Sequence, residues 1–370
     1  MLACLIANTG TASAVTRKEV LGKQIFNDTN LSSPPGQACA SCHSPDHFFI
    51  DPDQNEPTSE GVIDSRYGSR NAPTILYAAS SPLFHFEKEE GLYIGGQFDD
   101  GRAKDLKVQA RQPFLQAQEM NNSSPEEVVM KVRDASYAGL FISVYGAKSL
   151  DNPATAYTRI LDAISAFERT PAMSPFRSKY DRYLQGLAVL TLEEARGREI
   201  FERADKGNCA ACHPSRPSDN GRQRPLFTDH TYDNIGVPRN PANRFYTQAQ
   251  EFNPQGYDFV DIGLGDNVNE RTENGKFKVP TLRNIAKTGP YTHNGYFKTL
   301  RGVINFYNTR DVKPTCPDRF TSEEKAMAMG CWPVPEVKLN ENHAELGHLG
   351  LSGQEEADLE AFLNTLTDDL

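Results

Sequence analysis

The chain has 370 residues and a formal net charge of −10 at pH 7, with 38% hydrophobic and 24% charged residues. This length favours two domains, each large enough to bury its own core. The negative charge argues against a nucleic-acid partner, and no apolar run approaches the length of a membrane span.

Residues 1–15 form a short apolar stretch that ends in small residues. The pattern predicts the remnant of a secretory signal peptide that lacks its charged front. A frayed helix start is one alternative. A lipid anchor at Cys4 is another, because Met-Leu-Ala-Cys partly fits a lipobox.

The pattern Cys-x-x-Cys-His occurs twice, as Cys39, Cys42 and His43 and again as Cys209, Cys212 and His213. This pattern attaches a c-type haem. Cysteines three positions apart lie about one helical turn from each other, so both reach one porphyrin, and the adjacent histidine becomes an axial iron ligand. The motifs therefore predict two covalently bound haem c groups, which are assembled outside the cytoplasm.

Other uses of these cysteines fit the sequence less well. A zinc site would need the two pairs about 15 to 20 residues apart, and a redox-active pair would sit near a βαβ pattern, which is not visible. Cys316 and Cys331 remain after haem attachment. They either pair in an oxidising compartment, which would contribute roughly 3 kcal/mol, or stay free thiols.

The two halves of the chain echo each other, because Gly-x-x-Ile-Phe precedes each haem motif at residues 22–26 and 197–201. This repeat predicts a duplicated cytochrome c unit whose first helix packs its Ile-Phe edge on the porphyrin. We expect a mainly α protein with two cytochrome c-like haem domains, residues 16–170 and 191–370, joined by a linker at 171–190. Strand signals are few and short.

Helix start signals recur between and after the motifs. The predicted starts are Ser124, Asn152, Ser174, Thr191, Thr299 and Ser352, each followed by apolar residues at helical spacing. The stretch 214–275 is rich in Pro, Asn, Asp and Gly and shows little periodicity. We expect it to be an ordered loop wrapped around a cofactor.

Further motifs resemble the bacterial dihaem cytochrome c peroxidase family, which also contains MauG. They are residues 70–74, 96–103, 109–120, 279–284 and 288–295, in the family's order. The resemblance covers nearly the whole chain. It implies an N-terminal haem that reacts with peroxide and a C-terminal haem that transfers electrons.

The sixth position on each iron decides between an enzyme and an electron carrier, because only an iron with an open face binds peroxide. The resemblance places the sixth ligand of the second haem at Tyr307, where ordinary peroxidases have methionine and MauG has tyrosine. The pattern alone favours a core tyrosine instead. The alternative ligands are Met327, Met329, His343 and His348.

The resemblance also implies an open face on the N-terminal haem. Residues 58–60 contain no histidine where ordinary family members have one. His47 lies too close to His43 to reach over the ring, and His85 is a remote candidate.

The resemblance assigns two further sets of residues. Gln109, Pro113 and Glu119 match the family's distal residues; Glu119 would shuttle a proton of bound peroxide and Gln109 would orient the ligand. Solvated polar side chains are the alternative for Gln109 and Glu119. A calcium ion would bind the Asn71 side chain and the carbonyls of Thr288 and Pro290, with water completing the oxygen shell.

One departure from the family pattern concerns electron transfer between the haems. Asp99 stands where the family has an inter-haem tryptophan, and a carboxylate cannot relay electrons. The single tryptophan, Trp332, lies far along the chain, and residues 206–208 hold no counterpart of MauG's surface tryptophan. Transfer would have to use propionates, Phe98 or tyrosine side chains.

Three functions follow as hypotheses. The first is reduction of hydrogen peroxide with electrons from a small periplasmic cytochrome c or cupredoxin. The second is a MauG-like oxidase that modifies residues of a partner protein. The third is a non-catalytic dihaem electron-transfer cytochrome. We expect a periplasmic location, and because family members often dimerise, a homodimer is open.

Overall fold

The computed structural model describes residues 14–217 and 223–370, so the predicted signal remnant lies almost wholly outside the described residues. Helices dominate these ranges: α1 Arg17–Phe26, α2 Cys39–Cys42, α3 Leu106–Gln109, α4 Arg111–Leu115, α5 Pro125–Asp134, α6 Ala138–Tyr145, α7 Pro153–Glu168, α8 Lys179–Leu184, α9 Leu192–Glu202, α10 Leu264–Val268, α11 Leu300–Thr309, α12 Glu323–Met329 and α13 Gly353–Asn364. The strands are β1 His85–Glu87, β2 Leu92–Ile94, β3 Tyr232–Asp233 and β4 Phe277–Lys278. The mainly α class with few short strands is confirmed.

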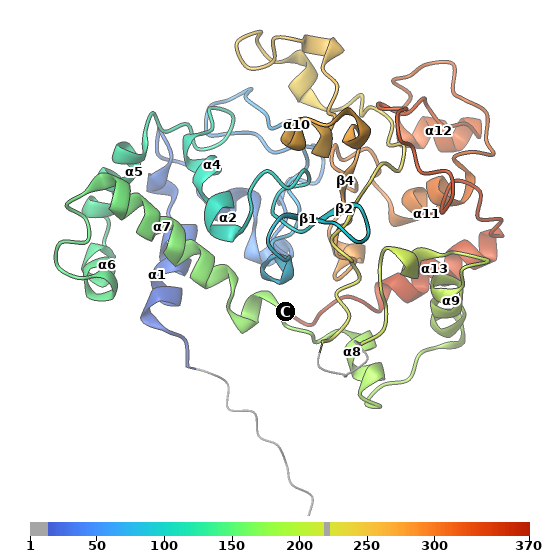
Figure 1. Cartoon of the computed structure of the whole chain (residues 1–370), viewed down its shortest axis with the longest axis horizontal. Coiled ribbons are helices and arrows are strands. Elements are labelled where there is room, and N and C mark those ends of the chain that lie inside the picture. The colour runs from blue at the N-terminus through green and yellow to red at the C-terminus, as the bar shows by residue number, and fades with distance from the viewer. Residues whose placement is uncertain (1–13, 218–222) are drawn as a thin grey trace, which may run out of the picture.

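Two pairs of closely packed helices stand at opposite sides of the molecule, α1 with α7 and α9 with α13 (Figure 1). The repeated glycines explain both contacts. A Cβ atom on Gly22 would lie 1.9 Å from the Ala163 carbonyl oxygen, and one on Gly197 would lie 1.8 Å from that of Asp358. Only glycine permits such close approach of two backbones. The Gly-x-x-Ile-Phe repeat thus has the same packing role in both halves.

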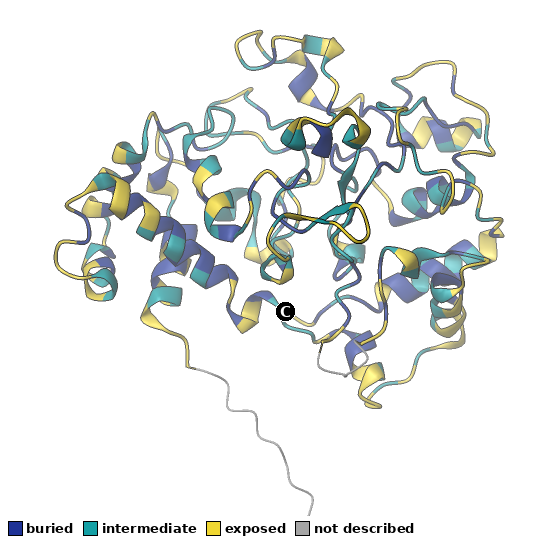
Figure 2. Cartoon of the chain, in the orientation of Figure 1, coloured by how far each residue is buried: buried dark blue, intermediate teal, exposed yellow. Residues whose placement is uncertain are grey.

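The hydrophobic core gathers on the inward faces of these helix pairs (Figure 2). One cluster surrounds Phe26 and Ile160, and a second surrounds Phe201 and Phe362. A third cluster includes Phe306, which belongs to α11. Edge-to-face ring contacts hold the second cluster together, with the Phe201 and Phe362 centroids 5.3 Å apart. Such ring pairs stabilise a core beyond the area that they bury.

Most predicted helix starts are confirmed by side chains that accept a hydrogen bond from the first turn. They are Ser124, Asn152, Thr191, Thr299 and Ser352. The start at Ser174 is wrong, because α8 begins at Lys179 and Ser178 forms its capping box with Asp181. Phe176 has φ 50°, so the chain turns sharply before the helix. The described part of 214–275 is mostly loop with short elements, among them β3 and α10.

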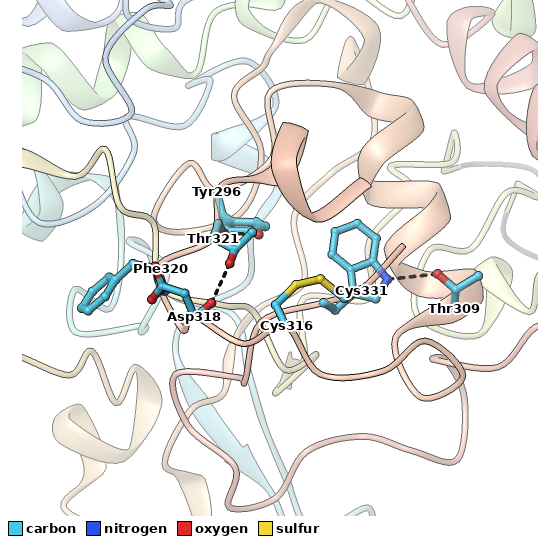
Figure 3. Close-up of a disulfide and its surroundings, with 8 residues drawn as sticks. Tyr296, Thr309, Cys316, Asp318, Phe320, Thr321 and Cys331 are labelled. Atoms are coloured by element: carbon cyan, nitrogen blue, oxygen red, sulfur yellow. Dashed lines mark hydrogen bonds between the residues drawn. A yellow bond between two sulfur atoms is a disulfide. The ribbon is translucent and has the colours of Figure 1, made fainter. Parts of the chain in front are cut away.

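A disulfide joins Cys316 to Cys331, so the alternative of two free thiols is wrong (Figure 3). The backbone beside it is also paired, because the Cys316 amide donates to the Trp332 carbonyl at 2.9 Å. The Trp332 indole donates to Thr309 Oγ1 at 3.0 Å, which fixes this segment against α11. The crosslink closes a sequence separation of 15 residues.

Replacing both Cys316 and Cys331 with serine is expected to lower the free energy of unfolding by about 3 kcal/mol, because the unfolded chain gains the freedom of an open loop. Urea denaturation followed by circular dichroism measures the change. Reductant added to the unmodified protein should shift the transition to the same degree. An unchanged midpoint in the double variant would contradict the prediction.

Candidate functional site

The first Cys-x-x-Cys-His motif forms the short helix α2 and the residue after it. The sulfurs of Cys39 and Cys42 are not disulfide-bonded, and burial raises the pKa of both thiols, that of Cys42 to about 12. His43 Nδ1 lies 3.2 Å from the Phe49 carbonyl oxygen. Because a carbonyl only accepts, Nδ1 carries the proton and Nε2 is the free ligand nitrogen. Burial lowers the His43 pKa, which favours the neutral imidazole that metals bind.

A cavity opens beside this motif and brings the predicted distal residues to it. Its lining includes Cys39, Cys42, His43, Gln109, Pro113 and Glu119. His43 is the one histidine among these lining residues. His47 instead contacts Ser44 at the surface, and His85 is exposed in β1. Thr58 is buried away from the lining, so the described residues place no second histidine at the cavity.

Glu119 enters the cavity from a turn that follows α4. The Met120 amide donates to the Pro113 carbonyl at 3.2 Å, and the Asn122 side chain donates to the Phe114 carbonyl at 2.7 Å. These bonds fold the turn back on the helix. Burial raises the Glu119 pKa to about 7, against the opposing effect of Arg102. A carboxyl group with such a pKa exchanges protons near neutral pH.

Two further polar residues line the cavity and were missed in the sequence. Glu168 ends α7 and is 4% exposed, its Oε2 atom has no hydrogen-bond partner, and burial raises its pKa to about 8. Gln37 donates to the Glu60 carbonyl at 2.9 Å, but its Oε1 atom has no partner. Glu168 lies on the same stripe of α7 as the apolar Ile164. A carboxylate on an apolar stripe is the sequence signal that could have identified it.

The residues around this cavity fit a covalently attached haem. Two unpaired thiols and a neutral imidazole stand at one side, and buried polar atoms without partners stand at the cavity wall. Buried polar atoms normally have partners in a protein, so orphaned ones facing a cavity indicate a bound group. Phe26, from the first Gly-x-x-Ile-Phe repeat, also lines the cavity.

The second motif repeats the same arrangement. His213 Nδ1 lies 2.7 Å from the Phe227 carbonyl oxygen, and burial lowers the His213 pKa to about 4. The thiols of Cys209 and Cys212 are again not disulfide-bonded, and burial raises the pKa of each to about 12. The residues here therefore also fit a c-type haem, with the imidazole Nε2 as the free ligand nitrogen.

Tyr307 lies beside the second motif, on α11. Burial and the nearby sulfurs of Cys212 and Cys209 raise its pKa. Tyr307 is half-buried, and among the described residues its hydroxyl group has no hydrogen-bond partner. The alternative ligands lie elsewhere: Met329 and His348 are exposed, Met327 packs in the third cluster, and His343 binds Asp311 at 2.9 Å.

Two of the three residues expected to bind calcium meet where the two halves of the chain join. Asn71 Nδ2 lies 2.5 Å from the Pro290 carbonyl oxygen, and the Asn71 amide donates to the His293 carbonyl at 2.7 Å. The Thr288 amide instead bonds to the Ile285 carbonyl. The structure thus brings Asn71 and Pro290 together.

Charged side chains also join the two halves close to Asp99. Arg70 forms ion pairs with Asp261 at 2.7 Å and with Asp100 at 2.6 Å. Burial raises the pKa of Asp99, whose carbonyl accepts from the Lys278 amide at 2.7 Å, and burial lowers the pKa of Lys278 to about 8. Position 99, where the family has a tryptophan, is therefore occupied by the Asp99 carboxyl group with cationic neighbours. The Phe98 ring stacks on the Arg102 guanidinium at 3.6 Å.

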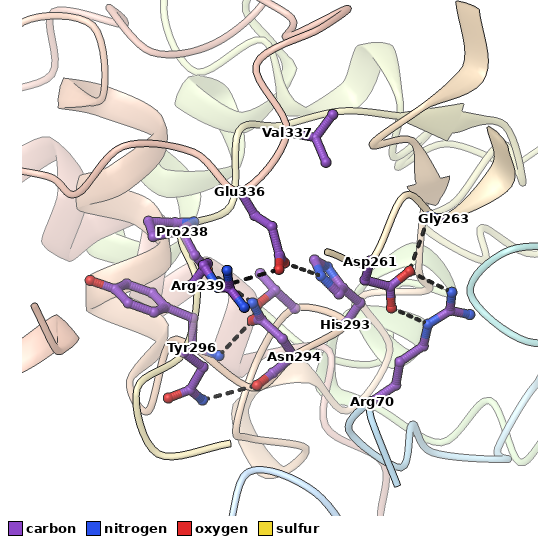
Figure 4. Close-up of polar contacts among 12 residues, drawn as sticks. Arg70, Pro238, Arg239, Asp261, Gly263, His293, Asn294, Tyr296, Glu336 and Val337 are labelled. Carbon is purple, nitrogen blue, oxygen red and sulfur yellow. Dashed lines mark hydrogen bonds and ion pairs between the residues drawn. The ribbon is translucent and has the colours of Figure 1, made fainter. Parts of the chain in front are cut away.

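Beside the Arg70–Asp261 pair, Figure 4 shows a second group of polar side chains, in which His293 and Arg239 face Glu336. His293 Nε2 lies 3.8 Å from Glu336 Oε2, and Arg239 Nε lies 3.7 Å from Glu336 Oε1. These three side chains are almost fully buried, which ties the loop around residue 336 to the junction of the halves.

The comparisons with known proteins agree with this arrangement. Residues 16–188 match the family described as di-haem cytochrome c peroxidase. Methylamine utilization protein MauG of Paracoccus denitrificans (strain Pd 1222) is 39% identical over 99% of this chain and 94% of its own length. The chain belongs to the di-haem cytochrome c peroxidase family. Cytochrome-c peroxidase IdrP2 of Denitromonas iodatirespirans, a further relative, is 30% identical over 98% of this chain and 83% of its own.

A solved structure extends the likeness to the fold. The diheme peroxidase BthA from Burkholderia thailandensis E264 superposes with a TM-score of 0.79 and 33% identity, over 96% of this chain and 87% of that one. As a member of the di-haem cytochrome c peroxidase family, the protein is a dihaem oxidoreductase, an enzyme of the peroxidase type. Of the helices that the structure describes, none is both long and apolar enough to cross a membrane.

Proposed function

We propose that the enzyme reduces hydrogen peroxide at the cavity beside His43, with electrons that arrive through the second motif. The observation that carries this proposal is the half-buried Glu119 carboxyl group, which lines the same cavity as His43 and has its pKa raised to about 7. Relatives named cytochrome-c peroxidase support the reaction. The partners are peroxide and a small electron donor, a cytochrome c or a cupredoxin.

Each haem would be held by its own motif. Cys39 and Cys42 would hold the first haem through thioethers and His43 would bind its iron, and Cys209, Cys212 and His213 would do the same for the second. Tyr307 would be a further protein ligand of the second haem. When bound, a haem supplies a redox-active iron whose ligands decide between binding peroxide and transferring electrons.

The protein's own residues control the proton in this proposal. Glu119 accepts the proton from one peroxide oxygen and returns it to the other, which leaves as water. Two electrons delivered through the second motif and two protons from solvent reduce the remaining oxygen to a second water. The Gln109 carboxamide orients the peroxide, and Pro113 contributes to the cavity wall. The cavity contains no second histidine among its lining residues that would block peroxide.

The same proposal covers the domains, the calcium ion, the location of the protein and its oligomeric state. The chain divides into a peroxidatic unit at 16–170, a linker at 171–190 and an electron-transfer unit at 191–370, in keeping with the two main hydrophobic clusters. Asn71, Thr288 and Pro290 would hold a calcium ion where the units meet. A disulfide and thioether-bound haems both suit the periplasm. Two such chains form a homodimer.

A MauG-like oxidase is the second candidate function. Tyr307 beside Cys209 and Cys212 favours it, as does the identity of 39% with a MauG protein. In this function the enzyme withdraws electrons from residues of a partner protein. Fast peroxide turnover with a reduced cytochrome supports the peroxidase, whereas slow turnover with a modified tryptophan or tyrosine on a partner supports the oxidase.

Electron paramagnetic resonance of the ferric holoprotein is expected to show one high-spin and one low-spin signal, because one iron has an open face and the other has two protein ligands. Tyr307→Phe removes the second ligand and should convert the low-spin signal to high-spin. Tyr257→Phe, at an exposed position, is the matched control. Two low-spin signals in the ferric protein, with only a low-spin signal left in the half-reduced protein, would overturn the proposed function.

A further inference from the structure

Four aromatic rings form a continuous path from the surface into the molecule. Phe86 on β1 is 47% exposed, and its ring centroid lies 4.9 Å from that of Tyr93 on β2. Tyr93 stacks on Phe84 with the centroids 5.5 Å apart and the planes 6° from parallel. Phe84 then meets Tyr232 on β3 edge to face at 6.1 Å. Tyr232 is 6% exposed, so the path ends in the interior.

The inner end of this path reaches the segments that surround the second haem motif. A Cβ atom on Gly101 would lie 2.3 Å from the Tyr232 hydroxyl and 2.7 Å from the Phe84 ring, so both rings pack directly on this glycine. Tyr232 pairs with Lys278 across β3 and β4. The chain just before Tyr232 is bonded to the motif, because the Asp229 amide donates to the Cys212 carbonyl at 3.0 Å.

Tyr93 has a built-in proton acceptor. Its hydroxyl donates to Glu270 Oε1 at 2.6 Å, and this contact raises the Tyr93 pKa to about 12. Removing an electron from a phenol makes its hydroxyl strongly acidic, so oxidation of a tyrosine needs a base within hydrogen-bond reach. Tyr232 differs, because its hydroxyl donates to the Gly95 carbonyl, which cannot take the proton.

The outer end of the path has the character of a docking surface for a basic protein. Phe86 and the neighbouring Leu83, 62% exposed, provide an apolar centre. The hairpin carries Glu87, Glu89 and Glu90 against a single lysine, Lys88. An acidic rim around an exposed ring steers a positively charged partner to that ring.

We propose that Tyr93 is a one-electron relay through which a basic redox protein, docked on the β1–β2 hairpin, delivers electrons toward the second haem motif. This inference rests on the proposed function, which supplies peroxide as the oxidant. One electron leaves Tyr93 inward while its hydroxyl proton moves to Glu270. The partner then returns one electron and Glu270 returns the proton. Two such cycles, with two protons from solvent, convert one hydrogen peroxide to two water molecules.

The test uses the holoprotein, peroxide and a reduced basic cytochrome c of the mitochondrial type as the probe. Tyr93→Phe keeps the ring but removes the hydroxyl proton, and it should slow cytochrome oxidation by about tenfold or more. Glu270→Gln should slow it similarly. Replacing Glu87, Glu89 and Glu90 with glutamine should weaken the salt dependence of the rate. Tyr257→Phe, outside the path, should leave the rate unchanged.

A second readout does not depend on turnover. Peroxide added without a donor should oxidise Tyr93, detected by peptide mass spectrometry, but not Tyr257. Cytochrome oxidation at the original rate in Tyr93→Phe, or no oxidation of the Tyr93 peptide, would overturn the relay. A small dye reductant separates the two proposals, because peroxide turnover with the dye should survive in Tyr93→Phe. Failure of the unmodified enzyme with the dye would overturn the proposed function and the relay with it.

Discussion

Replacing Glu119 with glutamine is expected to slow peroxide reduction by about 100- to 10,000-fold, because the variant cannot move the proton that turns the departing oxygen into water. Stopped-flow absorbance of the holoprotein mixed with peroxide measures the rate. Glu126→Gln, at an exposed position on α5, is the control and should react normally. Haem content should be unchanged in both variants. A glutamine variant at position 119 that reacts at the original rate would contradict the role of Glu119.

The same residue predicts a pH dependence. Burial raises the Glu119 pKa to about 7, so the carboxylate form that accepts the first proton becomes populated as the pH rises through that value. The kcat/KM for peroxide should therefore rise up to a pH of about 7 and level off above it. This rise of kcat/KM with pH should disappear in Glu119→Gln. If the rise persists in that variant, another group causes it.

Replacing Arg283 with methionine is expected to lower the free energy of unfolding by about 3 to 5 kcal/mol, because it leaves the Asp181 carboxylate buried without its partner. Arg283 is 1% exposed, and its two terminal nitrogens donate to the two Asp181 oxygens at 2.9 Å each. Its Nε donates to the Pro225 carbonyl at 2.8 Å. The guanidinium also lies 4.3 Å from the Phe176 ring centroid.

Urea denaturation at pH 7 measures this loss, and Asp181→Asn combined with Arg283→Met should recover part of it. Arg283 and other neighbours lower the Asp181 pKa below its ordinary value of 3.8. The stabilisation is therefore present above that pH and is lost as the pH falls through the lowered pKa of the folded protein. If Arg283→Met alone lowers the free energy of unfolding by less than about 1 kcal/mol, the Arg283–Asp181 pair contributes little to stability.

Local features of the sequence predicted what depends on residues close together in the chain. The Cys-x-x-Cys-His spacing requires only one turn of backbone, and the structure places the two thiols and the imidazole of each motif side by side. The capping residues were predicted for the same reason, since each bonds within the next turn. The failure at Ser174 fits this explanation, because a left-handed Phe176 redirects the chain before a helix can begin.

What the sequence determined by itself is thus the attachment chemistry, the helical class and, through the family motifs, the candidate site residues. Tertiary structure alone decided that Glu168 joins Glu119 in one cavity, that Tyr307 stands beside Cys212, and that Tyr232 joins the rings of the β1–β2 hairpin in a path to the surface. These contacts join residues far apart in the chain. Their geometry depends on how whole helices and loops pack, which no local periodicity records.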